Sequence, residues 1–178
     1  MRALLCAFVI LCSGCTTPPT VFSSVPSAKV FSQDIVLDYT VSYTNLKTQK
    51  SQTLITHLEI TPSSTAFIGL GPLGGTLFEC KQTSQDIACQ SINQAISAET
   101  FFADMQLIYW PQQTLQRHLQ PNYTLEDHKL TRNLYYDNNL ISAIHYSGQS
   151  KWDADVIFIN MRHSYRLDIH PLHAKVSK

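Results

Sequence analysis

The feature of this sequence that most limits its possible folds is a repeated alternation of hydrophobic and polar residues. From Ile35 to Tyr43 a hydrophobic residue stands at every second position, and mostly polar residues stand between them. Side chains of a β-strand point alternately to its two faces, so the pattern predicts a strand with one buried face. Comparable runs follow at 54–60, 65–70, 76–79, 86–91, 130–136, 140–146, 155–160 and 164–169. We therefore predict roughly nine strands, with connections short enough for antiparallel pairing.

Two of the connections have distinctive sequences. Asp137-Asn138-Asn139 separates two alternating runs, which predicts a β-hairpin. The stretch 69–75 is rich in glycine but lacks the spacing of a phosphate-binding loop, so we interpret it as a sharp connection between strands. An alternative interpretation is that Leu70 and Leu73 form an apolar loop tip available to a lipid or a partner.

The periodicity changes between residues 97 and 119. Phe101, Met105 and Ile108 repeat at i, i+4 and i+7, which predicts a helix that begins after Ser97 and ends or kinks at Trp110, before a proline. A second short helix is predicted at 114–119. The stripe of large apolar residues either packs against the sheet as ordinary core or lines a lipid-sized cavity under a helical lid. The cavity candidates are Phe101, Phe102, Met105, Ile108, Tyr109 and, at the rim, Trp110.

The first fifteen residues have the pattern of an export signal. A basic start at Arg2 is followed by an apolar run over residues 3–11 and then by Cys12-Ser13-Gly14-Cys15. The run is too short to span a bilayer as a permanent anchor. We predict a signal peptide at 1–14, a flexible tether at 15–29 that is rich in Thr, Pro and Ser, and one domain at 30–178.

The end of the signal resembles a bacterial lipobox, and this resemblance implies a lipid on Cys15. Thr16 stands where inner-membrane lipoproteins typically carry Asp, so the same resemblance implies the outer membrane, facing the periplasm. An ordinary signal peptide that is cut nearby is the alternative. Two or three acyl chains would hold a folded domain at the membrane surface.

Two cysteines remain after the signal and the lipidation site. Cys80 and Cys89 flank a segment with turn-forming residues, and a two-residue turn at Ser84-Gln85 would place the cysteines opposite each other. An oxidising compartment would then permit a cross-strand disulfide between them. Two free thiols are the alternative.

Composition excludes several classes of protein. The net charge is zero, with no basic run, which argues against a nucleic-acid partner. The hydrophobic fraction of 44% argues against disorder. The seven histidines include no HExxH, the CxxC at Cys12-Ser13-Gly14-Cys15 lies in the export signal, and His170 and His173 are separated by a proline. We therefore predict no metal site, no cofactor, no catalytic residue and no enzymatic activity.

Five segments together resemble a known family. They are residues 69–74, 102–111, 132–136, 141–146 and 164–169. They are similar to an uncharacterised family of Gram-negative lipoproteins whose members accompany aryl polyene biosynthesis loci. The predicted architecture is also similar to the lipoprotein carrier and receptor LolA/LolB. That resemblance implies an α+β, mainly β, fold, in which an incomplete antiparallel β-barrel surrounds an apolar cavity and central helices act as a lid.

The leading functional hypothesis is a periplasm-facing lipoprotein that binds or carries a lipid, an acyl chain or a lipoprotein, in aryl polyene export or assembly. The alternative is a non-catalytic structural or assembly lipoprotein with a filled core that acts through protein partners in the periplasm. Interior volume discriminates between them, because only a carrier requires more internal space than its own side chains fill.

Overall fold

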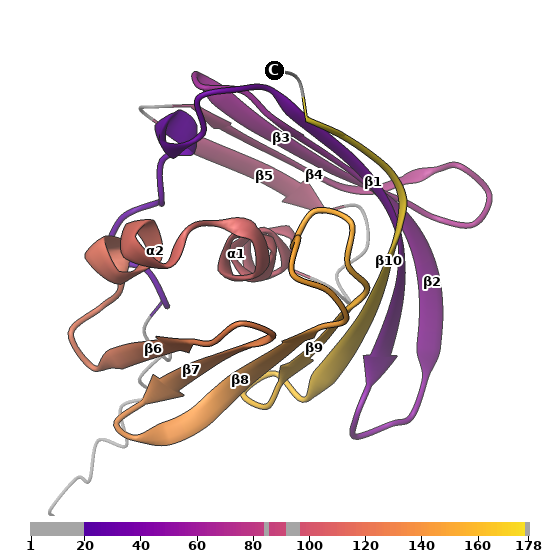
Figure 1. The fold of residues 1–178 in the computed structure, drawn as a ribbon. Helices are drawn as coiled ribbons and strands as arrows, with labels where there is room; N and C mark the ends of the chain where they lie inside the picture. The colour runs from indigo at the N-terminus through magenta and orange to yellow at the C-terminus, as the bar shows by residue number, and fades with distance from the viewer. Residues whose placement is uncertain (1–19, 84–85, 92–96, 177–178) are drawn as a thin grey trace, which may run out of the picture.

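The computed structural model describes residues 20–83, 86–91 and 97–176, and the main feature of this part is one antiparallel sheet (Figure 1). The ten strands lie in the order β5-β4-β3-β2-β1-β10-β9-β8-β7-β6. They span β1 Ile35–Asn45, β2 Ser51–Ile60, β3 Ser64–Leu70, β4 Thr76–Thr83, β5 Ile87–Ser91, β6 Tyr123–Asp127, β7 Thr131–Tyr136, β8 Asn139–Tyr146, β9 Val156–Asn160 and β10 Tyr165–Val176.

The sheet curls around a helix, as Figure 1 shows. Helix α1 (Ala98–Tyr109) lies inside the curve, and α2 (Gln112–His118) lies near its open side together with the short 3-10 helix η1 (Ala28–Val30). Strands β5 and β6 are the two edges of the sheet and do not pair with each other, so the barrel is incomplete. The mainly β fold class predicted from the sequence, with helices inside an open antiparallel sheet, is confirmed.

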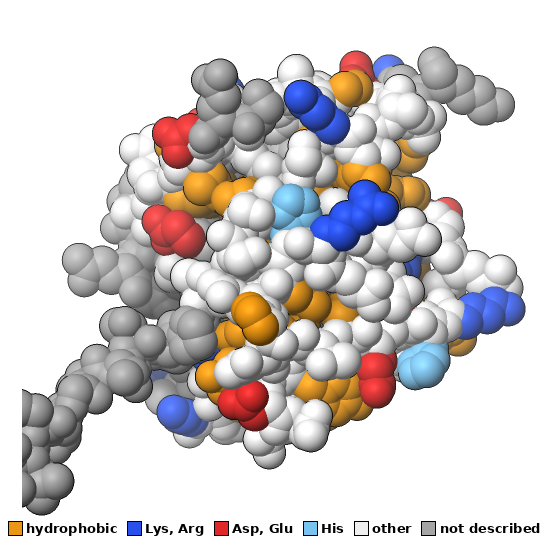
Figure 2. Space-filling view, turned by 90° about the vertical axis from the view of Figure 1, so that its left-hand side faces the viewer, with side chains coloured by type: hydrophobic (Ala, Val, Ile, Leu, Met, Phe, Trp, Pro, Cys, Tyr) orange, Lys and Arg blue, Asp and Glu red, His pale blue; other side chains and the backbone are white. Residues whose placement is uncertain are grey.

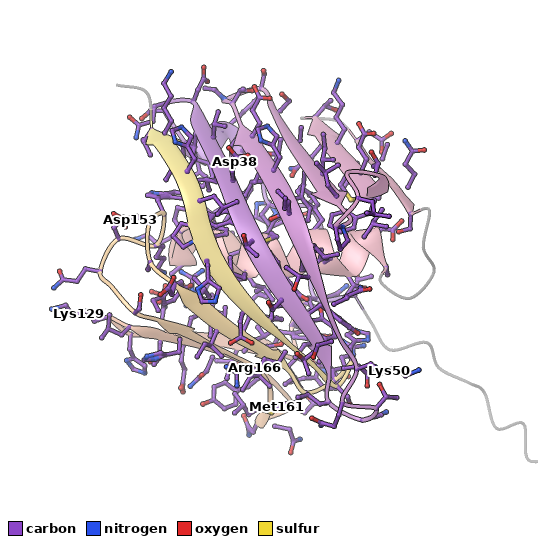
Figure 3. All side chains as sticks on the ribbon, turned by 90° about the vertical axis from the view of Figure 1, so that its right-hand side faces the viewer. Asp38, Lys50, Lys129, Asp153, Met161 and Arg166 are labelled. Atoms are coloured by element: carbon purple, nitrogen blue, oxygen red, sulfur yellow. A yellow bond between two sulfur atoms is a disulfide. The ribbon has the colours of Figure 1, made fainter. Side chains whose placement is uncertain are left out.

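The predicted alternation along β1 matches the structure. Ile35, Leu37, Tyr39 and Val41 are buried on the inner face. The outer face is polar, and Figure 3 looks onto it, with Asp38 and Arg166 among its labelled side chains. There the Nδ1 atom of His57 lies 2.7 Å from Oδ1 of Asp38. One buried face and one solvated face are typical of an antiparallel sheet.

The two predicted connections have the backbone conformations that their residues suggest. Asp137 and Asn138 have φ angles of 47° and 64°, as a tight hairpin between β7 and β8 requires. At the end of β3, a Cβ atom on Gly69 would lie 2.2 Å from the ring of Phe78, so only glycine fits that close approach. Gly74, with φ of 79°, turns the chain toward β4.

Two strand features differ from the prediction. Strand β6 was not expected, because only Tyr123 and Leu125 give its short segment an alternating pattern. Strand β10 does not end at residue 169 but continues past Pro171, pairing with β1. The register shifts between Asp38 and Tyr39, opposite this proline, and an irregularity of this kind accommodates a residue that lacks an N–H donor.

The segment that we expected to be a flexible tether is docked on the domain from residue 20 onward. The Ser23 N–H donates to the carbonyl of His118 at 2.8 Å, and Phe22 forms an isolated bridge with Leu119. Ala28 is buried. The folded unit therefore begins about ten residues earlier than the predicted boundary, because Val21 and Phe22 supply apolar contacts that the surrounding polar composition obscured.

The predictions for the N-terminus concern residues outside the described part of the chain. The signal peptide at 1–14 and the lipidation site at Cys15 both lie there. Within the described part, no helix is long and apolar enough to cross a membrane. Figure 2 shows the side of the molecule that lies at the left of Figure 1, where hydrophobic side chains form separate patches between polar atoms and isolated charges.

Candidate functional site

Helix α1 is the centre of the site, and it is buried on nearly all sides. The six cavity candidates of its apolar stripe are each at most 2% exposed. Phe67 of β3 contacts the rings of Phe101 and Phe102, at centroid distances of 5.4 and 6.1 Å. Phe78 of β4 meets Phe101 edge-on at 5.2 Å. At these contacts the stripe packs as a core layer, the first of the two interpretations of this stripe.

A half-open pocket of about 220 Å³ lies beside the N-terminal half of α1. Its walls come from α1, β8, β9, the turn after β9 and the docked N-terminal segment. The residues that define this Asp104 pocket are Thr20, Val21, Glu99, Thr100, Ala103, Asp104, Leu107, Ile141, Ser142, Asn160, Arg162 and His163.

A buried carboxyl group lies in the wall of this pocket. Asp104 is 3% exposed, and its Oδ2 atom accepts a hydrogen bond from the Tyr165 hydroxyl. The Asn160 amide donates to Oδ1 at 3.4 Å. Burial raises the pKa of Asp104 to about 7, against the two hydrogen bonds, which lower it. The carboxyl group therefore holds a proton over much of the acidic range in which an exposed Asp is ionised.

The lining of the Asp104 pocket combines polar and apolar side chains. Arg162 donates to the Tyr123 hydroxyl at 2.6 Å. Burial, and then the neighbouring Arg162, lowers the pKa of His163. Leu107 and Ile141 supply apolar wall. The pocket is thus amphipathic, with a shape and polarity suited to a molecule that has one polar end.

The C-terminal end of α1 is fixed by a buried arginine. Arg132 of β7 is 1% exposed, and its guanidinium donates to the carbonyls of Leu107 and, at 2.9 Å, Trp110. The last carbonyls of a helix lack partners within the helix and carry partial negative charge, so a cation there is favourable. The Tyr146 hydroxyl donates to the Ile108 carbonyl at 2.7 Å and completes this attachment.

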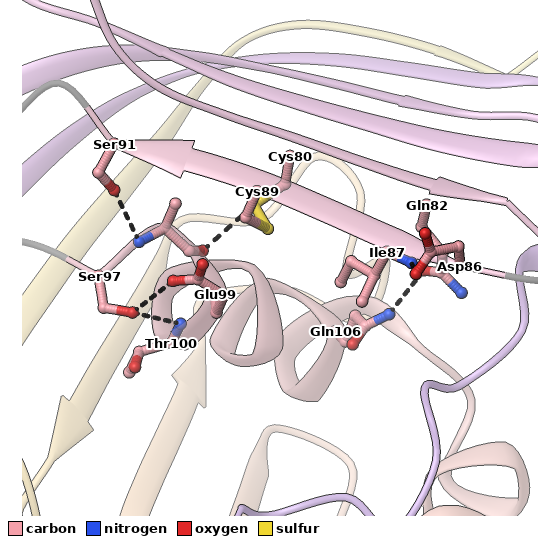
Figure 4. The surroundings of a disulfide bond; sticks show 11 residues. Cys80, Gln82, Asp86, Ile87, Cys89, Ser91, Ser97, Glu99, Thr100 and Gln106 are labelled. Carbon is pink, nitrogen blue, oxygen red and sulfur yellow. Dashed lines mark hydrogen bonds between the residues drawn. A yellow bond between two sulfur atoms is a disulfide. The ribbon is translucent and has the colours of Figure 1, made fainter.

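A buried amide chain attaches the middle of α1. Gln106 donates to the side-chain carbonyl of Gln82 on β4 at 2.9 Å, and Gln82 donates to the Pro26 carbonyl at 2.9 Å. Figure 4 shows Gln82 and Gln106 in this contact. These hydrogen bonds link the sheet, the helix and the N-terminal segment through buried side chains.

Sequence reasoning did not single out Asp104, Gln106 or Arg132. A signal was available, because residues 101–110 contain few polar side chains and a helix that is apolar all round is typically buried. Any polar residue within such a helix requires an internal partner.

The structure joins Cys80 of β4 to Cys89 of β5 in a disulfide, as Figure 4 shows. The two cysteines are register partners across the pair of strands. The bond ties the edge strand β5 to the sheet beside the start of α1. There the Ser97 hydroxyl caps the helix by accepting from the N–H of Thr100 at 3.3 Å.

We expect reduction of this disulfide to lower the free energy of unfolding by roughly 2–3 kcal/mol, the chain-entropy value for a loop of this length. The cysteines are nine residues apart. Urea denaturation with and without reductant measures the difference, and reduction keeps both side chains in place. An unchanged unfolding midpoint in reductant would show that the bond contributes nothing.

The predicted apolar loop tip is only partly exposed. Leu73 is fully exposed, whereas Leu70 is half-buried at the end of β3. The N–H of Gly71 donates to the carbonyl of Gly75 at 2.8 Å and closes the loop. Leu73 is therefore the side chain of this pair that can contact a lipid or a partner without a change in the loop.

The histidines form no cluster with other potential ligands in the described part of the chain, where no group of three or more His, Cys, Asp or Glu side chains could hold a metal ion. His57 pairs with Asp38 on the outer face, and His170 lies 3.0 Å from Asp155. His170 and His173 lie on β10 with exposed side chains.

Comparison with known proteins identifies the family. The sequence model of the family described as protein of unknown function (DUF3261) matches residues 39–173, so the chain belongs to that family. No curated protein matches. A crystal structure of a domain from Vibrio parahaemolyticus, described as an outer membrane lipoprotein-sorting protein, aligns with 8% identity over 82% of this chain and 86% of its own. The TM-score of 0.39 is too low to show a shared fold.

Proposed function

We propose that this member of the DUF3261 family is an outer-membrane lipoprotein that binds the acyl chain of a lipid or of another lipoprotein beside and beneath α1. The observation that carries the proposal is the amphipathic Asp104 pocket, which is half-open and reaches the flank of the central helix. Apolar wall within the pocket favours a hydrocarbon chain, and the polar side chains of the lining favour a head group.

The docked N-terminal segment supports a position close to the membrane. Thr20 and Val21 form part of the pocket wall, and five peptide units separate Thr20 from Cys15. Five residues span at most about 18 Å, whereas a free tether through residue 29 would span about 50 Å. If Cys15 carries the expected lipid, the mouth of the pocket therefore stays within a short distance of the bilayer surface.

A long acyl chain needs more room than the pocket offers as it stands. The volume of about 220 Å³ is below the roughly 300–1,000 Å³ of typical ligand sites. Movement of α1 away from the sheet would expose the buried inner layer, which includes Leu37, Leu58 and Phe158. Binding of a hydrocarbon chain there would be stabilised by about 25 cal/mol for each Å² of apolar surface that it removes from water. In this proposal α1 is a displaceable lid.

Uptake of cis-parinarate, a fluorescent fatty acid, tests the proposal. We expect the unlipidated domain to bind it, and we expect Ala103→Trp, which fills the pocket from α1, to weaken binding about tenfold through lost contact area. Ala88→Trp makes the same change at an exposed position of β5 and should bind like the unchanged protein. No uptake by the unchanged domain, or equal binding by both variants, would contradict the proposal.

The packed stripe of α1 favours a second candidate function, a non-catalytic assembly lipoprotein that acts through protein contacts. The exposed side chain of Leu73 would serve such a partner or the bilayer equally. Native mass spectrometry separates the two functions, because a carrier should retain lipid after purification from its own membrane and a scaffold should not. A role in aryl polyene export or assembly would narrow the choice of ligand, and this part of the proposal rests on the sequence resemblance.

A further inference from the structure

A second pocket lies at the other end of α1, and it combines aromatic rings with a cluster of charges. Its volume is about 350 Å³, within the range of small-molecule sites. We call it the Trp152 pocket, after the half-buried Trp152 in its lining; the other residues used below are Phe31, Tyr109, Trp110, Asp127, Arg132 and Lys151.

The aromatic wall consists of rings that pack on one another. The ring of Tyr109 stacks on that of Trp152 at 5.5 Å with an interplanar angle of 8°. Phe31 meets Trp152 edge-on at 5.7 Å and Trp110 edge-on at 5.2 Å. Stacked and edge-on rings hold one another in place, so the half-buried ring of Trp152 is held by buried rings and offers its exposed part to a flat ligand.

The charges in the pocket do not balance. Arg132 and Lys151 share one carboxylate, Asp127, whose Oδ2 atom lies 3.2 Å from the Lys151 ammonium. Burial alone would raise the pKa of Asp127, but the hydrogen bonds and charges of Arg132 and Lys151 lower it, so this group remains an anion. The cluster therefore carries one net positive charge.

This positive charge is partly removed from water. The side chains of Arg132 and Lys151 are 1% and 25% exposed. Burial, and then the repulsion of Arg132, lowers the pKa of Lys151. The Arg132 Nε atom is buried and has no hydrogen-bond partner in the described structure. The helix-end carbonyls offset part of the charge on Arg132, and a bound anion next to Lys151 would offset the positive charge that remains.

We propose that the Trp152 pocket binds a small organic monoanion with a flat apolar body, such as an aromatic or conjugated carboxylate. The carboxylate would lie against Lys151, and the flat body would lie against Trp152 and its neighbours. One net charge matches a carboxylate, and a ring system matches a wall of rings. This site is separate from the Asp104 pocket and does not depend on the acyl ligand proposed there.

The test uses 2-naphthoate as the probe and its neutral analogue 2-naphthamide as the charge control. The chain has two tryptophans, Trp110 and Trp152, and both line this pocket. The two indole N–H signals in a ¹⁵N-correlated NMR spectrum therefore report on it directly. We expect both signals to shift with naphthoate, and calorimetry to show naphthoate binding about tenfold more tightly than naphthamide, the scale of one charge-assisted hydrogen bond.

Two variants complete the experiment. Lys151→Met should weaken naphthoate binding about tenfold and leave naphthamide binding unchanged. Lys50→Met removes the same charge from an exposed turn, which Figure 3 shows well apart from Asp153, the neighbour of Trp152 in sequence, and should have no effect. Unshifted indole signals, equal affinity for the two probes, or equal behaviour of the two variants would overturn the proposal.

Discussion

Replacing Arg132 by methionine is expected to lower the free energy of unfolding by about 3–5 kcal/mol, the range seen when one partner of a buried ion pair is removed. The substitution keeps most of the side-chain length but removes the donors to the carbonyls of Leu107 and Trp110. Those carbonyls are buried helix-end groups, and Asp127 would lose its closest cation. Leaving the two carbonyls and the Asp127 carboxylate without this partner costs more free energy than the loss of one hydrogen bond.

Arg166→Met is the matched control for this prediction. Arg166 also pairs with a carboxylate, donating to Asp168 at 2.9 and 3.1 Å, but it is 41% exposed on the outer face. Exposed pairs contribute at most about 1 kcal/mol, so this variant should unfold close to the unchanged protein. Chemical denaturation of both variants gives the comparison. Equal losses would show that Arg132 does not fix the end of α1.

Loss of Arg132 should also loosen α1 relative to the sheet. Hydrogen exchange of the amides in α1 should then be faster in Arg132→Met than in Arg166→Met under native conditions, because local opening no longer breaks these contacts. If α1 is the lid proposed above, this variant should also take up cis-parinarate faster than the unchanged domain does.

The sheet could be predicted from the sequence because its determinants are local. Alternation along β1 and β8 marks the buried face, and Asp137 and Asn138 accept the positive φ angles of a tight hairpin. Even the pairing of Cys80 with Cys89 depends only on the position of one turn. Strand β6 has too few hydrophobic residues for the same reasoning to find it.

The site could not be predicted in the same way because its contacts join distant segments. Arg132 meets α1 across 22 and more residues, and Tyr165 meets Asp104 across 61. Periodicity reports which face of an element is apolar, but it does not report which polar residue finds an internal partner. Asp104 and Gln106 therefore look solvated in the sequence and are buried in the structure.

The apolar stripe of α1 shows a related limit, because its periodicity predicts burial but not whether a cavity is present. Its periodicity correctly predicts burial, yet burial is common to a filled core and to the lining of a cavity. Volume depends on how side chains of Phe67 and Phe78 meet Phe101 from separate strands, which no local pattern encodes. Open space lies instead beside the N-terminal half of the helix, at the Asp104 pocket, and next to its C-terminal end, at the Trp152 pocket.

Replacing Asp104 by asparagine is expected to make the protein more stable at high pH, by about 4 kcal/mol at its largest. Burial raises the pKa of Asp104 from 3.8 to about 7. Between these two values the folded state retains a proton that the unfolded state has lost, so the stability of the unchanged protein falls as the pH rises. Below about pH 4 Asp104 is protonated in both the folded and the unfolded state, and above about pH 7 it is ionised in both. The unchanged protein therefore loses stability through Asp104 only between these two pH values.

The measurement is the difference in unfolding free energy between the variant and the unchanged protein, followed from about pH 4 to pH 8. Asparagine stays neutral and can keep contacts with Tyr165 and Asn160, so the difference should be small at pH 4 and should rise across the window by up to about 1.4 kcal/mol per pH unit. Asp153→Asn, at an exposed turn, should show no such trend.

The outcome also decides the charge of the Asp104 pocket. A rising difference means that Asp104 is largely neutral below about pH 7, so in that range the pocket can accept a ligand with an anionic head group beside Arg162. A flat difference would mean that Tyr165 and Asn160 hold Asp104 as an anion. The pocket would then repel fatty acids and other carboxylates, and the acyl ligand would have to be neutral at its head, as the amide- or ester-linked chains of a lipoprotein are.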